Sequence, residues 1–181
     1  PIPILQVFRR KDGPWFENPI HESAAAWAAA HPRNVTFGDV AFVHYGFSNA
    51  VCADTAAGKS KTKRNIKMLL RWVERDPDNP VGWCYLATTL LSGDFKSYAD
   101  CKTACAKAWE LREDPRAQGH LVRLGHALTE MSLHFGQPEI VPDALDELET
   151  LHRPHPDFWY LKGLAMERLG QPRMARALYH D

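Results

Sequence analysis

The spacing of apolar residues changes along the chain, from a strand-like pattern to a helical one. In residues 1 to about 55, the runs ILQVF (4–8) and VTFGDVAFVHYGF (35–47) are rich in β-branched and aromatic residues and alternate with period two, as buried strands do. Between them, the alanine-rich HESAAAWAAAH (21–31) predicts a short helix. The first part of the chain is therefore predicted to be a small α/β unit.

From about residue 64 onward, apolar residues recur every three or four positions, which predicts amphipathic helices. Turn residues divide this stretch into about seven helices, most of roughly 11 to 20 residues. The predicted stops are Asp76-Pro77-Asp78-Asn79-Pro80, Gly93-Asp94, Asp114-Pro115, Gly136-Gln137-Pro138, Pro154-His155-Pro156 and Gly170-Gln171-Pro172.

These predicted helices repeat with a step of 38 residues. Trp83, Leu121 and Trp159 are in phase, and the same step relates further leucine, small and large positions: Leu86 to Leu124, Ala87 to Gly125 and Gly163, and Leu90 to Leu128 and Met166. The tetratricopeptide repeat (TPR) has this order on its first helix, with a small residue that admits the second helix, although its usual step is 34. We therefore expect TPR-like helical hairpins over residues 59–181, after a separate unit at 1–58.

Charge and cysteine content narrow the functional classes. The 22 lysines and arginines balance 22 aspartates and glutamates, so bulk charge favours neither nucleic acid nor membrane as a partner, and no apolar run is long enough for a membrane span. The four cysteines, Cys52, Cys84, Cys101 and Cys105, have no CxxC or zinc-finger spacing. Packed thiols outside disulfides favour a reducing compartment, hence the cytoplasm.

Four features of the first 70 residues carry candidate chemistry. In chain order they are Val7-Phe8-Arg9-Arg10, Ile20-His21-Glu22, His44-Tyr45-Gly46-Phe47, and a basic run with Lys59, Lys61, Lys63, Arg64 and Lys67. Each also has a structural explanation. Glu22 suits a helix N-terminus, His44 suits a hydrogen-bonded core position, and the lysines suit a solvated loop.

Taken in this order, and followed by TPR-like repeats, the four segments resemble a group of family 2 glycosyltransferases. The resemblance implies a GT-A fold and inverting sugar transfer, so that residues 1–58 are the C-terminal part of a catalytic domain. Such enzymes often carry arginine at the position of Gln6. The half of the domain that holds the nucleotide-binding strands and the metal-binding aspartate pair is not represented in these 181 residues. We therefore expect the chain alone to be inactive.

The resemblance also assigns roles to individual residues. Glu22 stands where the catalytic base is expected, with His21 bordering the site, and His44 stands where some GT-A enzymes contact the metal or the diphosphate. The donor diphosphate would be covered by a basic loop containing Lys59, Lys61, Lys63 and Arg64, with Arg9 and Tyr45 on the acceptor side. In the intact enzyme this implies a nucleotide-sugar donor, a glycan or protein acceptor, and a divalent metal such as Mg²⁺ or Mn²⁺.

An interaction module without catalysis is the alternative function. TPR-like stacks bind partner proteins along the face lined by their first helices. The candidate positions there are chemically mixed: Thr88, Thr89, Arg123, His126 and Lys162. Nucleic-acid binding through Lys59 to Lys67 is disfavoured, because the chain is neutral and no aromatic residue interrupts that run.

Overall fold

The computed structural model describes residues 29–30, 56–91 and 97–180, without the side chains of residues 56–60. The chain divides into two compact units, Pro1–Gly58 and Lys59–Asp181. In the first unit, Ala29 and Ala30 are helical, within the helix predicted at 21–31. The strands predicted at 4–8 and 35–47 lie outside the described residues, and so does the predicted α/β character of this unit.

The described part of the second unit is all-helical, with no strand among its elements, as the apolar spacing predicts. From residue 56 it contains seven α-helices and two short 3₁₀ helices. Their bounds are α2 Ala56–Arg75, α3 Pro80–Leu91, α4 Tyr98–Glu110, η4 Pro115–His120, α5 Leu121–Phe135, η5 Pro138–Ile140, α6 Val141–Leu151, α7 Pro156–Arg168 and α8 Pro172–His180. None of the described helices has the length and apolar character needed to cross a bilayer.

The predicted stops become turns of recognisable chemistry, except Gly93-Asp94, which lies outside the described residues. Gly136 and Gly170 end α5 and α7 with φ of 78° and 71°, a conformation that glycine adopts without strain. The amides of Gln137 and Gln171 then return to carbonyls five residues earlier, at 2.7 and 2.9 Å. This is the helix-ending pattern of a Schellman motif, and a proline opens the next helix in both copies.

The turn between α2 and α3 is fixed by polar side chains. Asn79 donates from Nδ2 to Asp76 at 2.8 Å and accepts from the amide of Val81 at 3.1 Å, which caps α3. The indole of Trp83 donates to the Pro77 carbonyl at 2.7 Å. The first of the three in-phase large residues therefore anchors this turn as well as packing beside the core.

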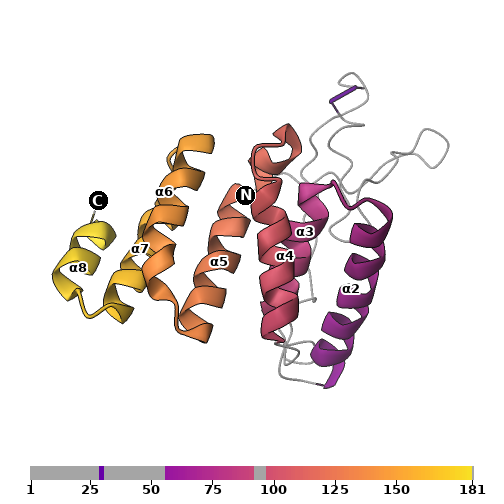
Figure 1. The fold of residues 1–181 in the computed structure, drawn as a ribbon, viewed down its shortest axis with the longest axis horizontal. Coiled ribbons are helices and arrows are strands. Elements are labelled where there is room, and N and C mark those ends of the chain that lie inside the picture. The colour runs from indigo at the N-terminus through magenta and orange to yellow at the C-terminus, as the bar shows by residue number, and fades with distance from the viewer. Residues whose placement is uncertain (1–28, 31–55, 92–96, 181) are drawn as a thin grey trace, which may run out of the picture. The chain divides into compact units, whose positions relative to one another are not determined.

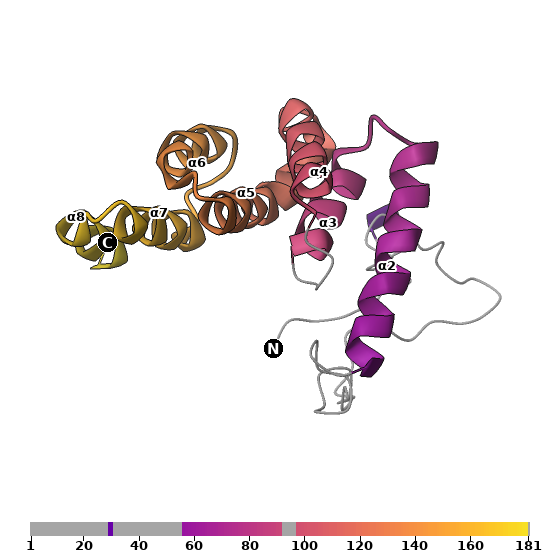
Figure 2. The same cartoon turned by 60° about the horizontal axis from the view of Figure 1, so that its bottom comes forward.

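The helices pack as successive antiparallel pairs (Figure 1). Each of α3, α5 and α7 contacts the helix that follows it, and α3 contacts α5 as α5 contacts α7. The first helices of the pairs therefore lie next to one another, and the turned view shows α5 and α7 in one layer with α6 over them (Figure 2). The helix α2 lies at the end of this row beside α3, where Gly82 faces Trp72 and Val73.

The 38-residue positions have the structural roles that their residue types predict. Leu86 and Leu124 are buried, and Ala87 is fully buried. A Cβ atom at Gly125 would stand 3.0 Å from Leu145 of α6. A Cβ at Gly163 would collide with the ring of Tyr179 on α8. At Gly125 and Gly163 the missing side chain therefore leaves room for a side chain from the second helix of the pair.

The core runs continuously from α3 to α7. Its largest fully buried side chain is Phe158, which lies among Leu121, Leu124 and Leu145 in one cluster. Because this cluster draws on both helices of one hairpin and the first helix of the next, neighbouring hairpins share one core rather than stacking as separate bodies.

Candidate functional site

The residues predicted to carry catalysis fall largely outside the described part of the chain. Arg9, His21, Glu22, His44 and Tyr45 are all in this group. Their roles as base, metal or diphosphate contact, and acceptor contacts remain predictions. The described part of the candidate site is the basic segment that follows them.

The basic segment is a helix, so the prediction of a loop over the diphosphate is wrong for its described residues. Lys59 to Arg64 lie in the first turns of α2, which begins at Ala56, about eight residues earlier than the apolar spacing predicts. Lys61, Lys63 and Arg64 have exposed side chains; the side chain of Lys59 is not described. A helix holds its cations at fixed spacing and does not fold over an anion as a loop does.

The helix forms because one of its faces is apolar. Leu69, Trp72 and Val73 are buried, with Leu69 fully so, and Ile66 is half-buried one turn before them. Lysine, arginine, leucine and methionine are favourable in helices, and they make up most of the sequence after Gly58. The apolar face begins at Ile66, and the polar residues before it extend the same helix back to Ala56.

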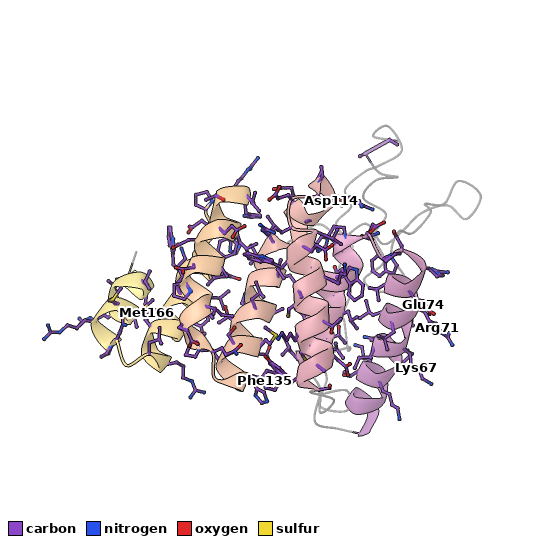
Figure 3. All side chains as sticks on the ribbon, viewed as in Figure 1. Lys67, Arg71, Glu74, Asp114, Phe135 and Met166 are labelled. Atoms are coloured by element: carbon purple, nitrogen blue, oxygen red, sulfur yellow. The ribbon has the colours of Figure 1, made fainter. Side chains whose placement is uncertain are left out.

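The opposite face of α2 carries a row of exposed cations. Lys63, Lys67, Arg71 and Arg75 follow one another at intervals of four, with Arg64 beside them; we call these five residues the basic face. Glu74 is the one acidic residue of the helix. Like charges at this interval destabilise a helix by roughly 0.2–0.5 kcal/mol per pair. In Figure 3, Lys67, Arg71 and Glu74 project from α2 on the side away from α3 and α4.

Arg71 and Arg75 were not predicted to belong to the site. The sequence nonetheless indicates them, because the step of four that links Lys59, Lys63 and Lys67 continues through both residues. Residues four apart share one face of a helix, so this step indicates a helix with a basic solvent-exposed face, whereas a loop imposes no such spacing.

On the first helices of the hairpins, the candidate partner-binding side chains are engaged within the unit. Thr88 donates its hydroxyl to the carbonyls of Cys84 and Tyr85, at 3.1 and 3.2 Å. The Arg123 guanidinium lies over the Tyr85 ring, 4.4 Å from its centroid. His126 Nε2 is 2.8 Å from an Asp157 carboxylate oxygen, which links α5 to α7. Thr89 is half-buried.

Lys162 is a correction to the sequence analysis, because it does not line a binding face. It is 8% exposed, and its ammonium lies 2.5 Å from Asp146 and 2.7 Å from Glu149 of α6. Burial alone would lower the pKa of Lys162, but hydrogen bonds to both carboxylates raise it. The burial agrees with the 38-residue step, since Lys162 stands 38 residues after the buried Leu124.

The buried cysteines offer no nucleophile. Cys84, Cys101 and Cys105 are buried and form no disulfide. Burial raises the pKa of Cys84 and of Cys105 to about 12, so both stay as thiols at neutral pH, and thiols are poor nucleophiles.

The described residues contain no group of three or more histidine, cysteine or acidic side chains that could hold a metal ion. The sequence has one Asp-x-Asp, Asp76-Pro77-Asp78. It lies in the turn between α2 and α3, where Asp76 accepts from Asn79, so its arrangement is that of a turn and not of a metal site. The predicted metal contact, His44, is outside the described residues.

Comparison with known proteins adds no assignment, because no protein-family model matches the chain and no curated protein does so significantly.

Proposed function

We propose that this chain is part of an inverting glycosyltransferase of the GT-A type, in which residues 1–58 belong to the catalytic domain and residues 59–181 form the TPR-like stack that follows it in the chain. The proposal is supported by the order of features along the chain. The segments at 7–10, 20–22 and 44–47 are followed by Lys61 to Asn65 and then by paired helices with a 38-residue step.

The geometry of α2 suits one part of this function. Lys61 and Arg64 are exposed and three residues apart on a helix, so their Cβ atoms lie about 5–6 Å apart on neighbouring positions of the surface. That spacing suits the two adjacent phosphates of a nucleoside diphosphate, and charge-assisted hydrogen bonds to phosphate are strong. The two cations are therefore assigned to the departing diphosphate.

The reaction then requires one displacement. The acceptor oxygen forms a bond to the anomeric carbon while the bond from that carbon to the diphosphate oxygen breaks, and Glu22 accepts the proton of the attacking hydroxyl. Lys61 and Arg64 stabilise the negative charge that develops on the leaving group. A divalent metal would supply further positive charge there, but no step is assigned to it, because the described residues lack a ligand set for it.

One observation favours an interaction role for the helical stack. Tyr160 and Tyr179 are 52% and 39% exposed, and their ring centroids are 5.9 Å apart, at the α7–α8 hairpin. Exposed aromatic residues are enriched among those that dominate protein interfaces. Within the proposed enzyme, this surface would present a glycan or protein acceptor to the catalytic domain. Without catalysis, it would make the chain an interaction module.

The diphosphate assignment is tested by paired substitutions on α2. In the intact protein, Lys61→Gln with Arg64→Gln is expected to weaken donor binding at least about tenfold, because hydrogen bonds to charged groups contribute roughly 1.5–3 kcal/mol each. The dissociation constant of the nucleotide-sugar, measured by calorimetry, gives the effect. The matched control is Lys67→Gln with Arg71→Gln, which removes the same charge from the same helix and should change binding less than about twofold. Equal losses in both would show that only the general field of α2 matters, against the assignment.

A further inference from the structure

The basic face of α2 is longer than a sugar-nucleotide donor requires. From Lys63 to Arg75 it spans twelve residues, or about 18 Å along the helix axis. The two phosphates of one donor occupy only the Lys61–Arg64 end of that length. The cations at Lys67, Arg71 and Arg75 are therefore left without a role in sugar transfer.

These cations also form one continuous exposed surface. Lys67, Arg71 and Arg75 are exposed, and the single acid of the helix, Glu74, does not balance them. Leu70 is 49% exposed, three residues from Lys67 and seven from Lys63, so it borders the same surface. The face thus combines several positive charges with one acid, Glu74, and one apolar side chain in water.

We infer that Lys67, Arg71 and Arg75 of the basic face bind the surface of an anionic lipid bilayer and hold the protein at the membrane without crossing it. A row of cations along one side of a helix can reach many headgroups at once, and each basic residue near an anionic membrane adds attraction. Leu70 is then buried at the boundary between headgroups and acyl chains. The exposure and charge of these residues carry the inference, and only their lack of a role in sugar transfer rests on the proposed function.

The same face fits nucleic acid less well. The exposed, described side chains of α2 are lysine, arginine, one leucine and one glutamate, with no aromatic ring on which an unpaired base can stack. Leu70 would also stay in water when the cations contact a phosphate backbone, so nucleic acid leaves this apolar side chain without a partner. A lipid surface makes use of both the cations and the leucine.

Co-sedimentation of the full chain with vesicles tests the inference. Vesicles of phosphatidylcholine containing 30% phosphatidylglycerol should bind the protein at about 0.1 M salt and release it at about 0.5 M, while pure phosphatidylcholine should not bind it. The variant Lys67→Gln/Arg71→Gln/Arg75→Gln should lower the partition coefficient by about 100-fold, since each basic residue contributes roughly a factor of five. All three residues are exposed, and unchanged circular dichroism would show that the fold is kept.

The matched control is Arg153→Gln/Arg173→Gln/Arg176→Gln, which removes three exposed cations from elsewhere in the same unit. It should change binding by less than about threefold. Equal losses in both variants, or equal binding to charged and uncharged vesicles, would overturn the inference. It would also be overturned if the protein bound a 20-base-pair duplex DNA under the same conditions but no vesicle. Donor turnover by the α2 variant should be unchanged, which separates failure here from failure of the proposed transferase.

Discussion

Replacing Glu22 with glutamine is expected to lower the turnover number of the intact enzyme by about 10²–10⁴-fold, the usual contribution of a positioned general base. Glutamine has nearly the same shape but cannot accept the proton of the attacking hydroxyl. Binding of the nucleotide-sugar should stay within about twofold of wild type, because Glu22 acts on the acceptor and not on the donor. Single-turnover kinetics and donor titration, made on the same preparation, measure the two quantities separately.

The control for this substitution is Glu139→Gln, which removes an exposed carboxylate from η5, outside the catalytic segments. It should leave turnover unchanged. If Glu22→Gln turns over like wild type, the base is a different residue, and the role that the family resemblance gives to Glu22 is wrong. If both donor binding and turnover collapse, Glu22 contributes to folding rather than to proton transfer.

Replacing Phe158 with alanine is expected to destabilise the helical unit by about 3–5 kcal/mol. Phe158 is fully buried, and its ring lies 3.1 Å from the place where Gly125 would carry a Cβ atom. Removing the ring therefore opens a cavity where α5, α6 and α7 meet. With a urea dependence of about 1–3 kcal/mol per molar, the midpoint of urea unfolding should fall by at least about 1 M.

Tyr160→Ala is the natural comparison, because Tyr160 lies two residues further along α7 and is 52% exposed. It should change the free energy of unfolding by no more than about 0.5 kcal/mol. Similar effects of the two substitutions would contradict the shared core that links one hairpin to the next.

Much of the helical unit follows from its sequence because the signals are local. Gly136 and Gly170 mark helix ends through their own backbone conformation, and the proline two residues later opens the next helix whatever surrounds it. The 38-residue step correctly places Gly125 and Gly163 where a side chain of the next helix packs closely against the backbone. These features need no knowledge of distant contacts.

The errors arise where tertiary packing overrides residue type. Lys162 was named among the candidate positions of a binding face on the first helices, yet it is buried, and Asp146 and Glu149 on the facing helix pair with its charge. The start of α2 was placed too late because Gly58 and the polar residues after it resemble a loop. These polar residues include lysines and an arginine that are favourable in helices, and Lys59, Lys63 and Lys67 keep a step of four. For Lys162, the 38-residue step was a better guide than the residue type.

The candidate catalytic residues were assigned from the order of motifs and not from periodicity. Glu22 and His44 were singled out by the order of short motifs, and both lie outside the described residues. Only the basic segment can be compared with the structure, and there the residues are exposed as a site requires while the predicted loop is a helix.

The stereochemistry of transfer is the most direct test of the central claim. The intact protein is incubated with α-linked nucleotide-sugars, with water or a simple glycan as acceptor, and the anomeric proton of the new product is followed by NMR from the first turnover. The proposal predicts release of the nucleoside diphosphate together with a β-configured product. A product that keeps the α configuration, or no turnover of any donor, would contradict it, and the absence of turnover would leave the helical stack as an interaction module.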